Sequence, residues 1–364
     1  MEKIVFGKMI IYKDTKFNFI EFFNPDNGFL LRSDVFGVDK QPPKQRSFPE
    51  LIDIGIMGTC HIASLGICKA AGIDCYQSAL VNRSPNMRFV DFERLIKEAS
   101  GKTFQIALGG AGDPNKHPDF FEMLKVARHY NIVPNLTTSG QFMTVQEIEY
   151  IKKYCGAVAV SFYTRLYGAN ESNPNTISAI KNLVNRGCVT NIHYVLSEDN
   201  IEEAFYRLKE NLFPTGINAV IFLLYKAAGL GIKNKELTLK NQNFIDFLKL
   251  VENNNFPFKI GFDTCCAPAI LKYCPSILEN SLDFCEAARF SMYIDSGLNA
   301  YPCSFDCDKK HFKVNMKNIT IKEAWESETF NEFRNIQQSS CAECLLKTKC
   351  SGKCNLNLCC NICS

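Results

Sequence analysis

The stretch LIDIGIMGTCHIASLGICKAAGIDCYQS, residues 51–78, carries the pattern on which the fold prediction rests. It opens with an isoleucine-rich apolar run at 51–57, which is typical of a buried β-strand. Three cysteines, Cys60, Cys68 and Cys75, follow within the next loop. The sequence therefore predicts a strand that leads directly into a cysteine-bearing loop.

Five more apolar runs follow, separated by segments whose apolar residues recur at helical spacing. The runs are 104–108, 132–137, 157–162, 189–196 and 217–225, and the helical segments are 89–100, 118–130, 144–154, 174–186 and 201–212. Thr144 with Glu147 forms a capping-box signature, and Pro174 stands behind an Asn cap at Asn173. Strands that alternate with helices predict an α/β fold with a parallel sheet, whose ligand sites lie at the carboxyl ends of its strands.

The composition narrows the class of protein. The 364 residues are 46% hydrophobic, and 41 basic residues nearly balance 38 acidic ones, so neither nucleic acid nor a membrane surface is an expected partner. The amino terminus has no signal-peptide pattern, and no apolar run approaches about 20 residues. Eighteen cysteines in such a chain predict a cytoplasmic protein whose thiols stay reduced and bind metal.

Three regions are expected. Residues 1–50 form an N-terminal extension with a β-hairpin around an Asn27-Gly28 turn. Residues 51–263 form the α/β core, which a helix at 244–252 and a strand at 258–262 complete. Residues 264–364 carry 13 of the 18 cysteines with little regular patterning, which indicates a module organised by metal.

The first cysteine group suits a four-iron cluster, because three thiolates leave one iron open to an exogenous ligand. A zinc site and reduced buried thiols are the alternatives. The group resembles that of the radical S-adenosylmethionine (SAM) superfamily, which places three cysteines after the first strand of a partial (βα)6 TIM-like barrel. The usual family spacing is C-x3-C-x2-C, whereas this chain has C-x7-C-x6-C, with Tyr76 after the last cysteine.

The resemblance extends to the strand ends that hold SAM in this superfamily. LGGAGDP at 108–114 resembles the family's Gly-Gly-Glu-Pro segment, with Asp in place of Glu. The positions that the resemblance implies for SAM are Gly110, Gly112, Asp113, Thr138, Ser139, Ser161 and His193. Strand-end capping by Ser and Thr is the alternative for those residues, and packing is the expected role of the other histidines.

The C-terminal cysteines resemble the SPASM extension of radical SAM enzymes, which ligates auxiliary [4Fe-4S] clusters. By that resemblance one cluster takes Cys285, Cys303 and Cys354 with a fourth ligand from Cys265, Cys266 or Cys274. The other takes Cys341, Cys344 and Cys350 with one of Cys359, Cys360 or Cys363. Four-cysteine zinc sites are the alternative. Cys155 and Cys188 are expected as buried structural thiols, and Cys307 receives no assignment.

The resemblance implies an enzyme that cleaves SAM reductively to a 5′-deoxyadenosyl radical, which abstracts hydrogen from a substrate. A peptide or protein maturase is the leading interpretation, with flavodoxin or ferredoxin as electron donor and Cys266 as a speculative hydrogen donor. A radical SAM enzyme acting on a small molecule is the second interpretation. A non-catalytic zinc or iron–sulfur binding module is the third.

Overall fold

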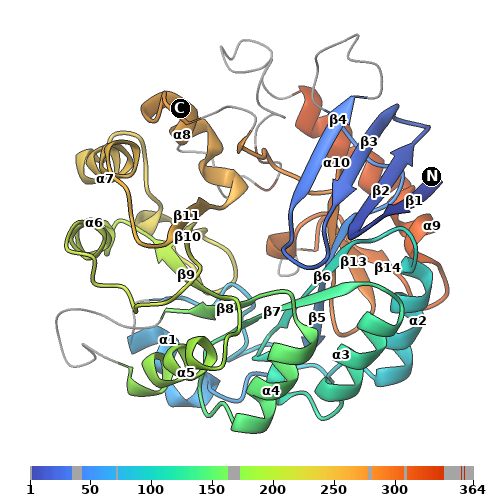
Figure 1. Ribbon diagram of the computed structural model, residues 1–364, viewed down its shortest axis with the longest axis horizontal. Coiled ribbons are helices and arrows are strands. Elements are labelled where there is room, and N and C mark those ends of the chain that lie inside the picture. The colour runs from blue at the N-terminus through green and yellow to red at the C-terminus, as the bar shows by residue number, and fades with distance from the viewer. Residues whose placement is uncertain are drawn as a thin grey trace.

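A computed structural model of the protein describes residues 2–34, 43–70, 73–162, 173–277, 281–306 and 310–339, together with Cys354 and Leu356. Two sheets organise it (Figure 1). One is a four-stranded antiparallel sheet near the amino terminus. The other has ten strands in the order β11-β10-β9-β8-β7-β6-β5-β12-β13-β14.

The parallel part of the large sheet matches the predicted α/β core. Its strands are β5 (Leu51–Met57), β6 (Gln105–Gly110), β7 (Val133–Thr138), β8 (Val158–Ser161), β9 (Thr190–Leu196), β10 (Ala219–Leu224) and β11 (Lys259–Phe262). The helices between them are α2 (Phe89–Ala99), α3 (Phe120–His129), α4 (Val145–Tyr154), α5 (Pro174–Asn185), α6 (Ile201–Lys209) and α7 (Gln242–Asn253). Each predicted strand and helix of the core is present, with ends shifted by a few residues. The α/β class with a parallel sheet is thus confirmed.

Local sequence signals place two of these helices. Thr144 accepts a hydrogen bond from the Glu147 backbone and the Glu147 side chain returns one, so α4 begins with a complete capping box. Asn173 accepts from the Thr176 backbone ahead of Pro174 at the start of α5. Both helix starts are where the sequence predicts them.

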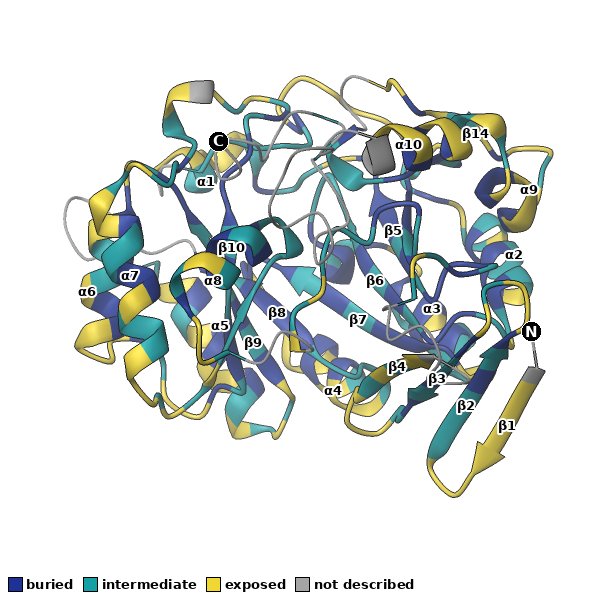
Figure 2. Ribbon diagram, turned by 90° about the horizontal axis from the view of Figure 1, so that it is seen from above, coloured by how far each residue is buried: buried dark blue, intermediate teal, exposed yellow. Residues whose placement is uncertain are grey.

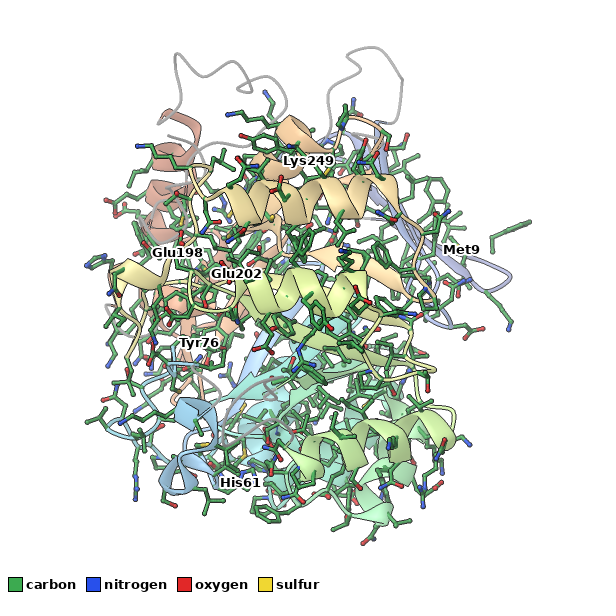
Figure 3. The ribbon with its side chains drawn as sticks, turned by 90° about the vertical axis from the view of Figure 1, so that its left-hand side faces the viewer. Met9, His61, Tyr76, Glu198, Glu202 and Lys249 are labelled. Atoms are coloured by element: carbon green, nitrogen blue, oxygen red, sulfur yellow. The ribbon has the colours of Figure 1, made fainter. Side chains whose placement is uncertain are left out.

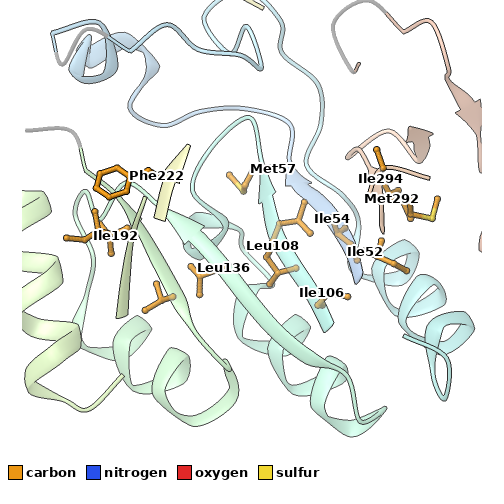
Figure 4. Close-up of a cluster of buried hydrophobic side chains, with 14 of the residues drawn as sticks. Ile52, Ile54, Met57, Ile106, Leu108, Leu136, Ile192, Phe222, Met292 and Ile294 are labelled. Atoms are coloured by element: carbon orange, nitrogen blue, oxygen red, sulfur yellow. The ribbon is translucent and has the colours of Figure 1, made fainter. Parts of the chain in front are cut away.

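The two faces of the parallel strands differ in character. Ile52, Ile54 and Leu108 are at most 1% exposed and belong to the cluster that packs against the helices (Figure 4). Alternate residues such as Asp53 and His193 are only half-buried and lie on the opposite, inner face. The inner face of the curved sheet is therefore the polar one, and the burial colours show the same contrast along the strands (Figure 2).

The cysteine-rich region continues the same sheet. β12 (Ser291–Ile294) pairs in parallel with β5, with Ser291 opposite Leu51. β13 (Asn299–Tyr301) and β14 (Val314–Asn315) add antiparallel strands beyond it, followed by α9 (Ile321–Trp325) and α10 (Glu328–Ser339). The pairing of β12 with β5 joins residues on both sides of the predicted boundary at 263. The domain boundaries at 50 and 263 therefore remain predictions.

The parallel strands do not close into a barrel. β11 lies at one end of the strand order, and β5 lies six strands away, paired on its outer side with β12. Within the described residues, no strand pairing joins β11 to β12, β13 or β14. α8 (Ala267–Tyr273) follows β11 in the chain. In the same described part, no helix is long and apolar enough to cross a membrane.

The N-terminal sheet contains β1 (Glu2–Phe6), β2 (Met9–Asp14), β3 (Phe19–Phe23) and β4 (Leu30–Asp34). β3 and β4 pair across the predicted turn, where Gly28 has a φ of +74°. Buried Arg46 joins this sheet to the rest, because its Nε lies 2.7 Å from Glu21 Oε2 and its Nη1 donates to the carbonyls of Phe48 and Lys102. Its own carbonyl accepts from Trp325 Nε1 at 3.0 Å.

We expect Arg46→Met to lower the free energy of unfolding by about 3–5 kcal/mol, since it removes the donor to the buried Glu21 carboxyl group and to two backbone carbonyls. The control is Lys8→Met, which removes an ion pair to Asp26 whose side chains are 79% and 56% exposed. That change should leave the free energy of unfolding nearly unchanged, because water screens an exposed pair. Denaturant unfolding of the purified protein measures both. Equal effects of the two substitutions would contradict the joining role of Arg46.

Candidate active site

The cysteine loop, residues 58–78, leaves the carboxyl end of β5. The Cys60 and Cys75 thiols are close enough to influence each other electrostatically, and the backbone N–H groups of Ile62 and Ala63 point at Cys60 Sγ. The Ala79 N–H lies 3.5 Å from Cys75 Sγ. Cys68 is half-buried in the short helix α1 (Ile67–Ala70). Burial raises the pKa of the Cys60 thiol, so this sulfur is more stable when protonated or bound to a metal than as a free thiolate.

Two glycines at and just after the end of β6 leave no space for a side chain. A Cβ at Gly110 would meet Met57 O, at the end of β5, at 2.4 Å, and one at Gly112 would meet Thr59 O at 2.4 Å and Cys60 Cα at 2.9 Å. Gly109 differs, because a Cβ there would meet no atom within 4 Å. Gly110 therefore packs against the last residue of β5 and Gly112 against the cysteine loop, whereas Gly109 faces open space.

Asp113 is positioned by the end of β7. Its Oδ1 accepts from Ser139 N at 2.8 Å and its Oδ2 accepts from Ser139 Oγ at 2.5 Å. Burial raises the pKa of Asp113, while the bonds from Ser139 and the nearby His61 oppose that change. Thr138 is buried and donates to Asn115 Oδ1 at 3.0 Å. The structure thus brings together three predicted SAM positions: Asp113, Thr138 and Ser139.

His61 is a site residue that the sequence prediction missed. It follows Cys60 in the loop (Figure 3). Its Nε2 lies 3.8 Å from Asp113 Oδ2. Both ring nitrogens are buried and neither makes a well-formed hydrogen bond. Burial lowers the pKa of His61, against the opposing effect of Asp113. Its place directly after a predicted ligand was the only available signal.

Ser161 and His193 lie side by side on β8 and β9, on the inner face of the sheet. Burial lowers the pKa of His193 to about 4. On β5 of the same face, burial raises the pKa of Asp53 to about 7. The inner face therefore favours the neutral forms of its titratable groups. The Tyr293 side chain, from β12, reaches the same inner face. Its hydroxyl occupies the space that a Cβ on Gly55 would need.

Four cysteines of the second group converge. The thiols of Cys285 and Cys303 interact electrostatically with each other and with those of Cys265 and Cys354, a set that we call the four-thiol group. Burial raises the pKa of Cys285 to about 12. Among the described residues, no three Cys, His, Asp or Glu side chains are close enough to hold a single metal ion.

The three candidates for the fourth position lie in different surroundings. Cys265 lies with the four-thiol group, whereas the buried Cys274 thiol donates toward Leu248 O at 3.5 Å. Cys266 is 0% exposed within the apolar core, so the structure gives its speculative role as hydrogen donor no support. Cys341, Cys344, Cys350, Cys359, Cys360 and Cys363 lie outside the described residues, as does Cys307.

An aromatic contact links the two cysteine groups. The Tyr76 ring lies 4.8 Å from the ring of Phe305, which is two residues beyond Cys303. Lys226 Nζ stands 4.8 Å above the same Phe305 ring and pairs with Asp263 at the end of β11. From the same loop, Gln77 Nε2 lies 3.4 Å from the Tyr293 hydroxyl. The cysteine loop is therefore packed directly against the C-terminal region.

The remaining two cysteines are remote from the site. Cys155 and Cys188 precede β8 and β9 and line a hollow of about 450 Å³ at the amino ends of these strands. Both are half-buried, and burial raises the pKa of Cys188 to about 11. These thiols suit the structural role expected for them.

Comparison with known proteins supports this arrangement. Residues 285–350 match the family model of SPASM, an iron–sulfur cluster-binding domain. No curated protein matches the chain by sequence. Among solved structures, SuiB of Streptococcus suis bound to S-adenosylmethionine aligns with a TM-score of 0.70 at 16% identity, covering 97% of this chain and 96% of SuiB.

Two further structures extend the likeness. SuiB bound to its precursor peptide SuiA gives a TM-score of 0.69 at 16% identity, covering 98% of this chain and 96% of that one. The anSMEcpe protein with bound AdoMet and Cp18Cys peptide gives 0.58 at 18% identity, covering 84% and 89%. The predicted fold class and the predicted SPASM resemblance are thus confirmed.

We expect Gly112→Ala to displace the cysteine loop and to lose about four iron atoms per chain from the reconstituted protein. Gly109→Ala is the matched control and should keep its iron, because its new methyl group meets nothing. Iron analysis and circular dichroism after anaerobic reconstitution measure the outcome. Full iron content in a folded Gly112→Ala protein would show that the loop tolerates the clash.

We expect Cys265→Ala to lose about four iron atoms per chain, as removal of a cluster ligand does. Cys274→Ala removes a buried thiol outside the four-thiol group and should keep all the iron. Iron content and the visible absorption of the clusters report the difference. Equal iron in the two variants would remove Cys265 from the ligand set.

Proposed function

We propose that the protein is a radical SAM enzyme that modifies a peptide or protein. The observation that carries the proposal is the junction of the cysteine loop with Asp113 at the carboxyl edge of the parallel sheet. Around that junction, Gly110 fits against the end of β5 and Gly112 against the loop, without space for a side chain at either position. The fold likeness to SuiB over 97% of the chain supports it.

The chain's donor set fits an iron–sulfur cluster at the cysteine loop. Cys60, Cys68 and Cys75 would hold it, and N–H groups directed at Cys60 Sγ are the interactions that stabilise a cluster thiolate. Such a cluster, with SAM bound, supplies the electron that cleaves SAM to methionine and a 5′-deoxyadenosyl radical. Three cysteines leave one iron position for that ligand.

The neighbouring residues would bind and orient SAM. The Asp113 carboxylate, fixed by Ser139, suits the ammonium of the methionine moiety. Gly109 leaves backbone accessible on the open side of β6. Ser161 and His193, on strands farther along the sheet, would contact the ribose or adenine.

The inner face of the half-barrel would receive the substrate. Its titratable residues Asp53 and His193 favour neutral forms, so this face offers hydrogen bonds with little charge. The four-thiol group, with its matched SPASM region, would hold an auxiliary cluster. A peptide substrate is favoured because SuiB and anSMEcpe bind peptides on a related fold.

The cellular setting follows from the same chemistry. Thiolate ligands must stay reduced to bind iron, so we place the protein in the cytoplasm. An electron donor of the flavodoxin or ferredoxin kind would reduce the first cluster.

The test is production of 5′-deoxyadenosine by the anaerobically reconstituted protein with SAM and dithionite. The wild type should form it, and the Cys60→Ala/Cys68→Ala/Cys75→Ala variant should form none, because that variant has no first cluster. The Cys155→Ala/Cys188→Ala variant lacks two cysteines at the amino ends of β8 and β9, away from the cysteine loop. It should form as much 5′-deoxyadenosine as the wild type. Tightly bound zinc with no 5′-deoxyadenosine in the wild type would instead establish a binding module.

The substrate class is tested with short peptides encoded beside the gene. A peptide that loses the mass of two hydrogens has been crosslinked or oxidised, and one that gains deuterium from heavy water has been epimerised. A wild type that forms 5′-deoxyadenosine yet changes none of these peptides would favour a small-molecule substrate.

A further inference from the structure

We propose that His61 binds the carboxylate of the SAM methionine moiety, as the hydrogen-bond donor that complements Asp113. The inference rests on the proposed function, since it assumes that SAM binds beside the cysteine loop. Nothing in the sequence resemblance assigns His61 a role. The assignment comes from the surroundings of its ring.

The first observation is an unused hydrogen-bonding group. Both nitrogens of His61 are removed from solvent, and neither has a hydrogen-bond partner of ordinary geometry. A buried polar group without a partner costs about 1–3 kcal/mol, so a persistent one indicates a missing ligand. By contrast, buried His117 uses both nitrogens, at 2.9 Å from Met87 O and 3.0 Å from Asp119 N.

The second observation is the charge around the ring. Asp113, Lys116 and Glu147 are the charged side chains that influence His61, and the Gln141 backbone makes a hydrogen-bonding contact with its ring that falls outside ordinary geometry. Lys116 is already engaged, with its Nζ 2.7 Å from Phe142 O and 2.8 Å from Glu147 Oε1. Its ammonium is therefore committed to other acceptors.

The ligand's chemistry matches this pair of groups. The methionine end of SAM carries one ammonium and one carboxylate on adjacent carbons. Asp113 attracts the ammonium but would repel the carboxylate, which needs a donor at short range. His61 Nε2, 3.8 Å from Asp113 Oδ2, supplies a donor beside the acidic group. An imidazole can donate from one nitrogen even when neutral.

The position of His61 in the chain fixes it relative to the cluster. It is the residue after Cys60, and Ala63 and Leu65 follow it in a 3₁₀ turn, η1 (Ala63–Leu65). A carboxylate that ligates a metal is commonly held by a further hydrogen bond that orients it. His61 is therefore a positioning residue for the group that would approach the open iron.

The experiment measures SAM affinity by equilibrium binding to the anaerobically reconstituted full-length protein. His61→Leu removes the donor and should weaken SAM binding about tenfold or more, with iron content unchanged. His61→Gln places an amide nitrogen near the Nε2 position and should restore most of the affinity. The exposed His129→Leu is the matched control and should bind SAM like the wild type.

A second readout is the electron paramagnetic resonance spectrum of the reduced cluster. In His61→Leu, the change that SAM causes in this spectrum should require correspondingly more SAM. If His61→Leu loses its iron, His61→Asn replaces it, because asparagine is too short to reach the Nε2 position. Tight binding by His61→Gln with weak binding by His61→Asn is then the expected result.

Two results would overturn the inference. Wild-type SAM affinity in His61→Leu would show that the ring does not contact the carboxylate. Iron loss in both His61→Leu and His61→Gln would show that the ring serves loop packing. Failure of the proposed function is distinct, because the wild-type protein itself would then bind no iron or no SAM.

Discussion

The parallel strands do not form a closed barrel, and cysteine thiols from the two sides of the opening interact with one another. Cys265 follows β11 at one edge, whereas Cys285 and Cys303 flank the strands beyond β5 at the other. Their thiols converge with that of Cys354 between two edges that no described strand pairing joins. Ligation there would couple metal binding to the closure of the fold.

That closure also sets the relation between the two cysteine groups. β5 pairs with β6 on one side and β12 on the other, so the strand that leads to Cys60 is shared by the core and the C-terminal region. The contact of Tyr76 with Phe305 continues the connection at side-chain level. A substrate on the inner face would therefore lie close to both regions.

The sequence predicted the core elements because their signals are local. Ile52 and Ile54 alternate with inner-face residues, and Thr144 with Glu147 caps a helix through bonds three residues apart. It could not select Cys265 over Cys266 or Cys274, because that choice depends on contacts with residues far along the chain. His61 was missed for a related reason. Its burial beside Asp113 arises only when the fold brings the cysteine loop next to the ends of β6 and β7. The strand pairing of β12 with β5 had no sequence signal, since it joins residues about 240 apart through backbone hydrogen bonds.

The central claim is that iron binds at the cysteine loop and at the four-thiol group, with SAM at the first site. Anomalous scattering at the iron and zinc absorption edges, from crystals of the reconstituted protein grown with SAM, tests it most directly. We expect iron signal beside Cys60 and Cys75 and among Cys265, Cys285, Cys303 and Cys354, with the methionine end of SAM facing Asp113. Zinc signal at these thiols, or no metal at the cysteine loop of a protein that retains its fold, would contradict it.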